Sequence, residues 1–354
     1  MRKSWLIVSV ASLMLGVVFS GVPKAAELPQ SIELGTHAIG SINNTLGSGL
    51  ANIAFKYSGM KVTSRPTSGP PAWVPLLSKT GSPEAGLIDA YEAWQSYTGK
   101  MWATTSPPGT PKMALRYEKH ENLRMLLIGG NLMLGGIVRD DSGIKTLKDM
   151  RGKRMTWEFS GFPGNIWVGL TALASVGMTP NDLNRVSVSG LIEGLDALNE
   201  GRVDLAWGAV GAAKVKELDS QKGVHFVPCG TDPALVKKAL FSYIGADIGT
   251  VKAGITAIKV DTPLILVPTT VIASTHMPDI VAYTLTKVWW EQNEGLGTIH
   301  PLLKAWRTDG FVSQRSTLPY HTGAIKFYKE KGVWTDKMEE VQKRLLKYEF
   351  PLLD

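Results

Sequence analysis

The sequence contains a single cysteine, Cys229, in 354 residues. One thiol cannot form an intrachain disulfide or a thiolate metal cluster, and Cys229 stands in VHFVPCGTD without a nearby basic partner that would activate it. The six histidines are scattered without metal-site spacing, so we expect no bound metal and no cofactor. The motifs GxSxG, HExxH, GxxxxGKS/T and GxGxxG are also missing. These absences argue against an enzyme.

An excess of charge of one sign is also lacking. The formal net charge is +7, and the three cations of the first 26 residues have no acid to offset them, which leaves +4 for the rest. Basic residues cluster in KTLKDMRGKR, Lys145 to Arg154, which is more typical of a solvated helix and turn than of a nucleic-acid surface. Nucleic acid is therefore not an expected partner.

Long apolar runs are rare after the N-terminus. A basic pair precedes the run from Trp5 to Phe19, and a patch of small residues ends at Ala26, as in a secretory signal. We predict that residues 1–26 are a signal peptide and that the mature chain is a freely soluble periplasmic protein. An uncleaved anchor is the alternative, because Pro23 or Lys24 would occupy the position three residues before the cut.

Runs of Val, Ile and Leu alternate with helical patterns through the rest of the chain, which predicts an α/β fold with largely parallel sheets. In SGLIEGLDALNEGRVDLAWGAVG, Leu191, Leu195 and Leu198 share one helical face and Gly201 ends the helix. The strand VDLAW follows, and another apolar stretch, Val186 to Val188, precedes the helix. This segment predicts a βαβ unit.

The pattern falls into two groups, before about Ile128 and after about Arg139. The connection LLIGGNLMLGGIVR carries paired glycines that resemble a hinge, and a second crossing from Asp261 to Thr275 returns the chain. We expect a two-lobe fold with a ligand cleft between the lobes, lobe I comprising 27–136 and 267–354 and lobe II comprising 137–266. Helices predicted at Asp279–Glu291, His321–Lys331 and Thr335–Tyr348 would pack on lobe I.

A glycine-rich stretch, GTHAIGSINNTLGSGLANIAFK, runs from Gly35 to Lys56 directly after the apolar run SIEL. Glycines let backbone N–H groups approach a ligand, and a following helix has free N–H groups in its first turn. An ordinary strand-to-helix connection explains the same residues equally well.

The run GTHAIGSINNTLGSGLAN resembles the first ligand loop of the TAXI-type solute receptors of TRAP transporters, which read roughly GTASTGGTYYPLGGALAN. Further segments match in the same order: TSGPPAWVPLLS from Thr67, AGLIDAYEAWQSYTG from Ala85, RDDSGIKTLKDMRGKRMTW from Arg139, TALASVGMTPNDL from Thr171, EGRVDLAWGAVGAAKVKEL from Glu200 and YHTGAIKFYKEKG from Tyr320. The resemblance implies a monomeric receptor with the two-lobe periplasmic-binding-protein type II fold. Such a receptor closes on an organic anion and delivers it to a permease driven by an ion gradient. A binding protein for an ATP-driven importer or a sensor is the alternative.

Departures from the family pattern bear on the ligand. The two tyrosines of the first loop are replaced by Asn43 and Asn44, the family's Thr-Gly-Gly-Ser is replaced by a segment followed by Trp73, and the second-lobe Gly-Ser-Gly-Thr becomes Phe162 to Asn165. The backbone pattern is kept while polar anchors are exchanged for rings. A carboxylic acid with an apolar or aromatic body is therefore favoured over a small acidic amino acid.

The residues predicted to bind the ligand lie on loops that face a cleft in this family. They are Gly35, Thr36, His37, Ser41, Asn43, Trp73, Asp89, Tyr91, Trp157, Ser160, Phe162, Gly164, Asn165, Trp207 and Val210. In this interpretation the helix start at Pro163 to Asn165 holds the acid group and the rings of Trp73, Tyr91 and Trp157 hold the body. Tryptophans are more often core residues, and Asp89 and Glu92 could simply be solvated.

Overall fold

The computed structural model describes residues 27–100 and 118–350. The predicted signal peptide, 1–26, lies outside the described residues and stays a prediction. Among the described helices, none is both long enough and apolar enough to cross a bilayer.

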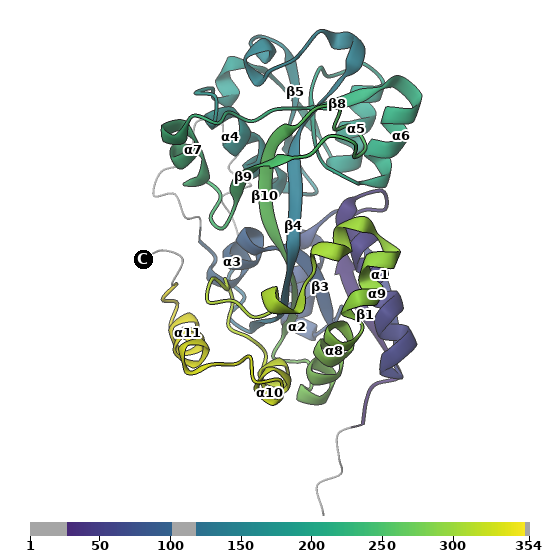
Figure 1. Ribbon diagram of the computed structural model, residues 1–354, viewed down its shortest axis with the longest axis vertical. Coiled ribbons are helices and arrows are strands. Elements are labelled where there is room, and N and C mark those ends of the chain that lie inside the picture. Colours follow the sequence, from purple (N-terminus) through teal and green to yellow (C-terminus); the bar gives the residue numbers. More distant parts are fainter. Residues whose placement is uncertain (1–26, 101–117, 351–354) are drawn as a thin grey trace, which may run out of the picture.

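The protein has a two-lobe α/β fold (Figure 1). Lobe I begins with three strand–helix pairs: β1 Ser31–Thr36, α1 Ile42–Ser58, β2 Lys61–Pro66, α2 Pro70–Thr80, β3 Ala85–Asp89 and α3 Ala90–Thr98. Strands β2 and β3 lie on either side of β1 and parallel to it. Their carboxyl ends therefore meet at one edge, where loops of parallel sheets carry ligands.

Two long strands connect the lobes. Strands β4 Leu123–Arg139 and β10 Thr262–Ser274 pair antiparallel and run through the middle of the molecule (Figure 1). The large sheet has the order β2-β1-β3-β10-β4-β7, with β8 on β4 and β9 on β10. The two predicted crossings are thus confirmed as one paired ribbon, but the expectation of largely parallel sheets is wrong for this sheet. Two strands that cross between lobes in opposite directions must pair antiparallel.

Lobe II lies at the top of Figure 1 and follows β4. Its elements are β5 Arg154–Phe159, α4 Ile166–Ala174, β6 Asn184–Val188, α5 Leu191–Asn199, β7 Ala206–Ala209, α6 Ala213–Lys222, β8 Val224–Val227, α7 Pro233–Leu240 and β9 Asp247–Val251. The predicted order strand–helix–strand is confirmed as β6–α5–β7, but β6 belongs to a two-stranded sheet with β5 while β7 belongs to the large sheet. Helix α5 buries Leu195 and Leu198, and Gly201 follows with a left-handed φ of 74°. Strand β5 lies between β6 and the start of β7. It pairs parallel with β6, and its Met155 forms an isolated β-bridge with Leu205, the residue before β7.

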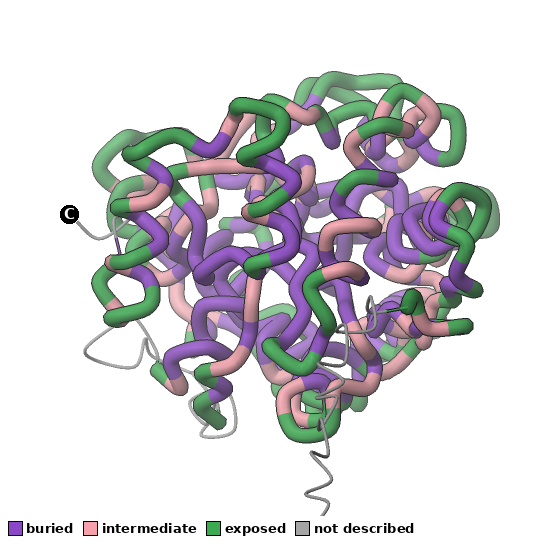
Figure 2. The backbone as a smooth tube through the Cα atoms, turned by 90° about the horizontal axis from the view of Figure 1, so that it is seen from below, coloured by how far each residue is buried: buried purple, intermediate pink, exposed green. Residues whose placement is uncertain are grey.

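The C-terminal helices cover lobe I. They are α8 Asp279–Glu291, α9 Asn293–Ile299, α10 Thr322–Glu330 and α11 Asp336–Leu346, which agrees with the three predicted helices and adds a fourth. Figure 2 shows buried segments in the interior and exposed segments around them. The exact lobe boundaries at 136, 137, 266 and 267 stay predictions.

The hinge-like glycines of β4 have a packing role. A Cβ on Gly129 would lie 2.5 Å from Trp306 Cε2, and one on Gly136 would lie 2.8 Å from Leu205 Cδ1. Neither glycine has a positive φ, so neither is needed for an unusual backbone conformation. The absence of a side chain at these glycines leaves room for Trp306 of lobe I and Leu205 of lobe II to pack directly against β4.

The glycine-rich stretch is a shorter loop than the sequence suggests. Helix α1 begins at Ile42 with Ser41 as its cap, so Gly47 and Gly49 lie inside the helix. A Cβ on Gly47 would lie 2.4 Å from Thr36 Cγ2, which shows why the helix can approach β1 so closely. The loop between β1 and α1 therefore ends at Ser41, and the later glycines of the stretch belong to the helix. Of the glycines from 35 to 49, Gly40 keeps a loop role, with a φ of 93°.

Candidate functional site

A small cavity lies between the lobes, with a volume of about 40 Å³. Its polar walls come from the β1–α1 loop, the end of β3 and the start of α4. Apolar walls come from β4 and from lobe II. The lining residues are His37, Ser41, Ile42, Asn43, Asp89, Leu132, Leu134, Phe162, Gly164, Asn165, Val168, Leu191, Gly208, Ala209 and Tyr243.

The lobes touch around this cavity. The backbone N–H of Lys214 in lobe II donates to the carbonyl of Gly40 at 3.1 Å. The rings of His37 and Phe162 meet edge to face, with centroids 4.7 Å apart. A Cβ on Gly69 would lie 2.9 Å from Phe162, so the two lobes are in close contact here as well. The cleft is closed in this structure.

The first lobe presents the start of α1 to the cavity. Ser41 caps the helix by accepting the N–H of Asn44 at 3.1 Å. The Asn43 amide nitrogen lies 3.2 Å from His37 Nε2. Because an amide nitrogen can only donate, Nε2 accepts and the imidazole proton lies on Nδ1. Burial lowers the pKa of His37 to about 4, which agrees with this neutral form.

The second lobe presents the start of α4. The 3₁₀ turn Pro163–Asn165 leads directly into the helix, with proline at a first-turn position. The predicted helix start is confirmed. Asn165 Nδ2 and, across the cavity, Asn43 Oδ1 are buried without a hydrogen-bond partner among the described residues. Buried polar atoms are normally paired, and these two atoms belong to residues of the cavity wall, within reach of a molecule bound there.

Asp89 is buried at the edge of the cavity. Its Oδ1 accepts the N–H groups of Tyr91 and Glu92, both at 2.9 Å, and so caps α3. Burial raises the pKa of Asp89, while hydrogen bonds from Glu92 and Tyr243 oppose this effect. Asp89 and Glu92 are 7% and 1% exposed. The alternative that they are simply solvated is therefore wrong.

Tyr243 is a site residue that the sequence analysis missed. Its hydroxyl, in the turn after α7, donates to Asp89 Oδ2 at 3.1 Å from the opposite lobe. No motif marks this tyrosine, since its position depends on how the lobes close. Other missed lining residues are apolar or small and carry no sequence signal: Ile42, Leu132, Leu134, Val168, Leu191, Gly208 and Ala209.

The tryptophans expected to face the ligand lie in the core. Trp73 is fully buried beneath the sheet, where a Cβ on Gly86 would lie 2.5 Å from its ring. Trp157 and Trp207 pack against Gly169 in the same manner. Tyr91 is buried against Trp167, with centroids 5.5 Å apart. None of these rings lines the cavity, so the prediction that they hold the body of a ligand there is not met.

The remaining predicted residues divide into two groups. Brought together at the cavity are His37, Ser41, Asn43, Asp89, Phe162, Gly164 and Asn165. Outside the lining are Gly35, which packs on Trp73; Thr36, whose hydroxyl accepts from Asn44; Ser160, which is exposed; and Val210, whose N–H donates to Met133.

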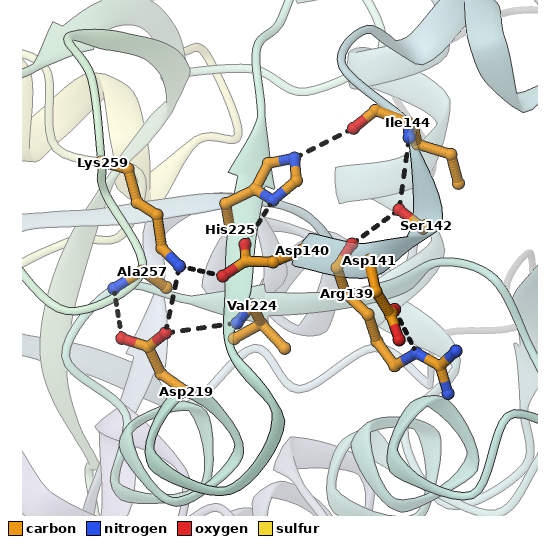
Figure 3. Close-up of polar contacts among 10 residues, drawn as sticks. All are labelled: Arg139, Asp140, Asp141, Ser142, Ile144, Asp219, Val224, His225, Ala257 and Lys259. Carbon is orange, nitrogen blue, oxygen red and sulfur yellow. Dashed lines mark hydrogen bonds and ion pairs between the residues drawn. The ribbon is translucent and has the colours of Figure 1, made fainter.

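A second polar cluster, drawn in Figure 3, lies in lobe II and shares no residue with the cavity lining. His225 places Nδ1 2.8 Å from Asp140 and Nε2 3.0 Å from the carbonyl of Ile144. Lys259 bonds Asp140, and Asp219 accepts the N–H groups of Val224 and Ala257. These bonds join the end of β4 to β8 and to the segment before β10. The cluster is therefore best understood as a structural connection.

The NMT1-like family model matches residues 34–332. The chain belongs to the NMT1-like family. All seven segments that resemble TAXI-type receptors fall inside this range. The assignment to the TAXI type itself stays a prediction.

Solved structures share the fold at low identity. A periplasmic transporter is 12% identical with a TM-score of 0.52, over 91% of this chain and 98% of that one. An R. palustris protein solved with adipate is 14% identical with a TM-score of 0.51, over 90% and 98%. A binding protein of a Pseudomonas aeruginosa ABC phosphonate transporter is 12% identical with a TM-score of 0.49, over 90% and 99%. At these identities the likeness of the first two, whose TM-scores exceed 0.5, establishes the fold alone.

Proposed function

We propose that the protein is an extracytoplasmic solute-binding protein that captures a small organic acid between its lobes and delivers it to a membrane permease. One observation carries the proposal: the closed cavity contains two buried, unpartnered amide atoms of the described residues, Asn43 Oδ1 and Asn165 Nδ2, one from each lobe. A solute that bonds these atoms, directly or through a water molecule, joins the lobes. The role is binding and transport rather than catalysis.

The acid group fits the two helix starts. Helix α1 begins at the cavity, where Ser41 takes the N–H of Asn44 and the N–H groups before it have no partner within the helix. At α4 the N–H groups of Asn165 and Ile166 are bonded to carbonyls of the preceding 3₁₀ turn, so this end offers the helix dipole and the Asn165 side chain. Such an end favours a negative charge by roughly 0.3 to 2 kcal/mol. Asn165 Nδ2 donates to the same group, and Asn43 Oδ1, which can only accept, bonds a water molecule held beside the ionised acid group.

The body of the ligand lies on apolar walls. Leu132 and Leu134 of β4 line the cavity together with Phe162, Val168 and Leu191 of lobe II. Phe162 thereby takes the role that the sequence analysis gave to Trp73 and Trp157. An aliphatic acid suits this lining as well as an aromatic one.

Calorimetry on the chain from Glu27 onward tests the proposal. The probes are acetate, butyrate, hexanoate, adipate, benzoate, an alkanesulfonate and glutamate. Replacing Asn165 by Ala should weaken the best acid by about tenfold, because its buried amide donor is lost. Asn184, exposed on β6, is the matched control, and Asn184→Ala should leave affinity unchanged. Failure of every acid to bind would refute the proposed function.

The class of permease is a separate part of the proposal. The resemblance to TAXI-type receptors supports an ion-gradient-driven TRAP permease, and an ATP-driven importer is the alternative. Uptake of the identified acid by cells that express the protein and its permease separates the two. Collapse of the ion gradient with ATP maintained abolishes uptake by a TRAP permease and leaves an ATP-driven importer active.

A further inference from the structure

A groove of about 620 Å³ lies on the other face of the interlobe ribbon. Residues paired across an antiparallel ribbon share a face, and successive residues alternate between faces. Leu132 of β4 faces the cavity, whereas its neighbour Asn131, paired with Pro268 of β10, faces the groove. Leu266 of β10 also lines the groove. The ribbon therefore has a space on each side.

On one side of β10, side chains and not a strand separate the cavity from the groove. On the edge of β10 away from β4, strand β3 ends at Asp89 opposite Thr269, and β9 begins at Asp247 opposite Leu266. Residues 267 and 268 thus have no paired strand on that edge among the described residues. Asp89 and Tyr243 line the cavity at this gap, while Ala90 and Gly245 line the groove. The hydrogen bond from Tyr243 to Asp89 closes the gap.

The groove itself has features of a ligand site. Its volume is within the range of roughly 300 to 1,000 Å³ that is usual for small-molecule pockets. Ile128, Leu266 and Val312 give it an apolar wall. Thr317 is 1% exposed and lines the groove, and its hydroxyl has no hydrogen-bond partner among the described residues. An unpartnered buried hydroxyl beside an apolar wall suits a chain with a polar end.

We propose that the ligand is a straight-chain carboxylic acid with a polar far end, whose acid group lies in the cavity and whose chain passes Tyr243 and Asp89 into the groove. This inference rests on the proposed function. The cavity of about 40 Å³ has room for an acid group and little more, whereas the groove has room for a long chain. Tyr243 is then the specificity-determining residue, because its ring must turn aside to admit the chain. Thr317 bonds the polar end.

The test compares chain lengths in the chain from Glu27 onward. Calorimetry with acetate, butyrate, hexanoate, octanoate and decanoate should show affinity rising by about threefold for each added methylene beyond butyrate. Ala246→Trp fills the groove at its lobe II wall. This variant should weaken octanoate by about tenfold or more and leave butyrate within about twofold. Ala253→Trp, at an exposed lobe II position outside both linings, is the matched control and should change neither acid.

A second variant tests the polar end. Octanoate with a terminal hydroxyl should bind more tightly than octanoate in the parent protein, and Thr317→Val should abolish this preference while retaining octanoate binding. Affinity that stops rising at butyrate, or an Ala246→Trp variant that weakens short and long acids equally, would overturn the inference and leave the proposed function in place. Failure of every acid, short ones included, would refute the proposed function as well.

Discussion

The hydroxyl of Tyr243, in lobe II, lies 3.1 Å from Oδ2 of Asp89, at the end of a strand in lobe I. This hydrogen bond is made between side chains that are 2% and 7% exposed. Its partners are 154 positions apart in the chain, and they meet because the lobes are closed. The contact therefore stabilises the closed state specifically.

Tyr243→Phe should weaken binding of butyrate, which is too short to displace the Tyr243 ring, by roughly threefold to tenfold, since a buried hydrogen bond contributes about 0.5 to 1.5 kcal/mol. The ring and its contact with Tyr91 are retained. Tyr283→Phe is the control, because that hydroxyl bonds Glu330 at the surface of lobe I. Calorimetry gives the affinities, and small-angle scattering should show a larger radius of gyration for ligand-free Tyr243→Phe. Equal effects of the two substitutions would contradict a role for Tyr243 in closure.

His37 should make the protein less stable in acid. Burial lowers the pKa of His37 from its ordinary 6.5 to about 4, so between these values protons bind the unfolded chain in preference to the folded one. The free energy of unfolding should therefore fall by up to about 3 kcal/mol as the pH drops from 6.5 toward about 4, and this contribution of neutral His37 is fully present above pH 6.5. His37→Gln, which cannot be protonated in this range, should show a smaller loss in urea unfolding over that window. The exposed His276→Gln should follow the parent curve.

Gly86→Ala should destabilise the fold without changing the ligand site. The added Cβ would lie 2.5 Å from Trp73 Cη2, beneath the sheet. Overpacking of this kind costs typically 1 to 3 kcal/mol. Gly295→Ala, on α9 with nothing within 4 Å of the added Cβ, is the control and should be neutral or slightly stabilising. Thermal unfolding measures both, and calorimetry on the folded variants should give the parent affinity.

Cys229 should be inert in the native protein. Burial raises the pKa of its thiol to about 12, so almost no thiolate exists at neutral pH. A thiol reagent such as Ellman's reagent should react slowly with the native protein. After unfolding in urea it should react rapidly with one thiol per chain. Because the sequence has no other cysteine, the reaction rate reports opening of this core directly. Rapid stoichiometric reaction in buffer would contradict the buried placement.

The sequence was sufficient for features that depend on local pattern. Helix α8 has the predicted bounds, and the turn at Gly201 and the helix start at Pro163 occur where their residues indicate. The first loop and the second-lobe helix start were also identified as neighbours of the cleft through the family pattern. Such features follow from capping residues, proline, glycine and hydrophobic periodicity, all of which act over a few neighbouring positions.

Tertiary structure alone decided which side chains face the cavity. Trp73 and Asn43 both lie at the start of a helix that follows a strand, yet Trp73 is buried beneath the sheet while Asn43 lines the cavity. The glycines that admit Trp73, Gly35 and Gly86, come from two different strands, so their shared purpose appears when the strands pair. Tyr243 and Asp89 likewise become partners when segments far apart in the chain pack together, in this case across the two lobes. Local chemistry sets where a strand ends and a helix begins, but the partner of a side chain across a cleft is fixed by how distant segments pack, which no short stretch of sequence encodes.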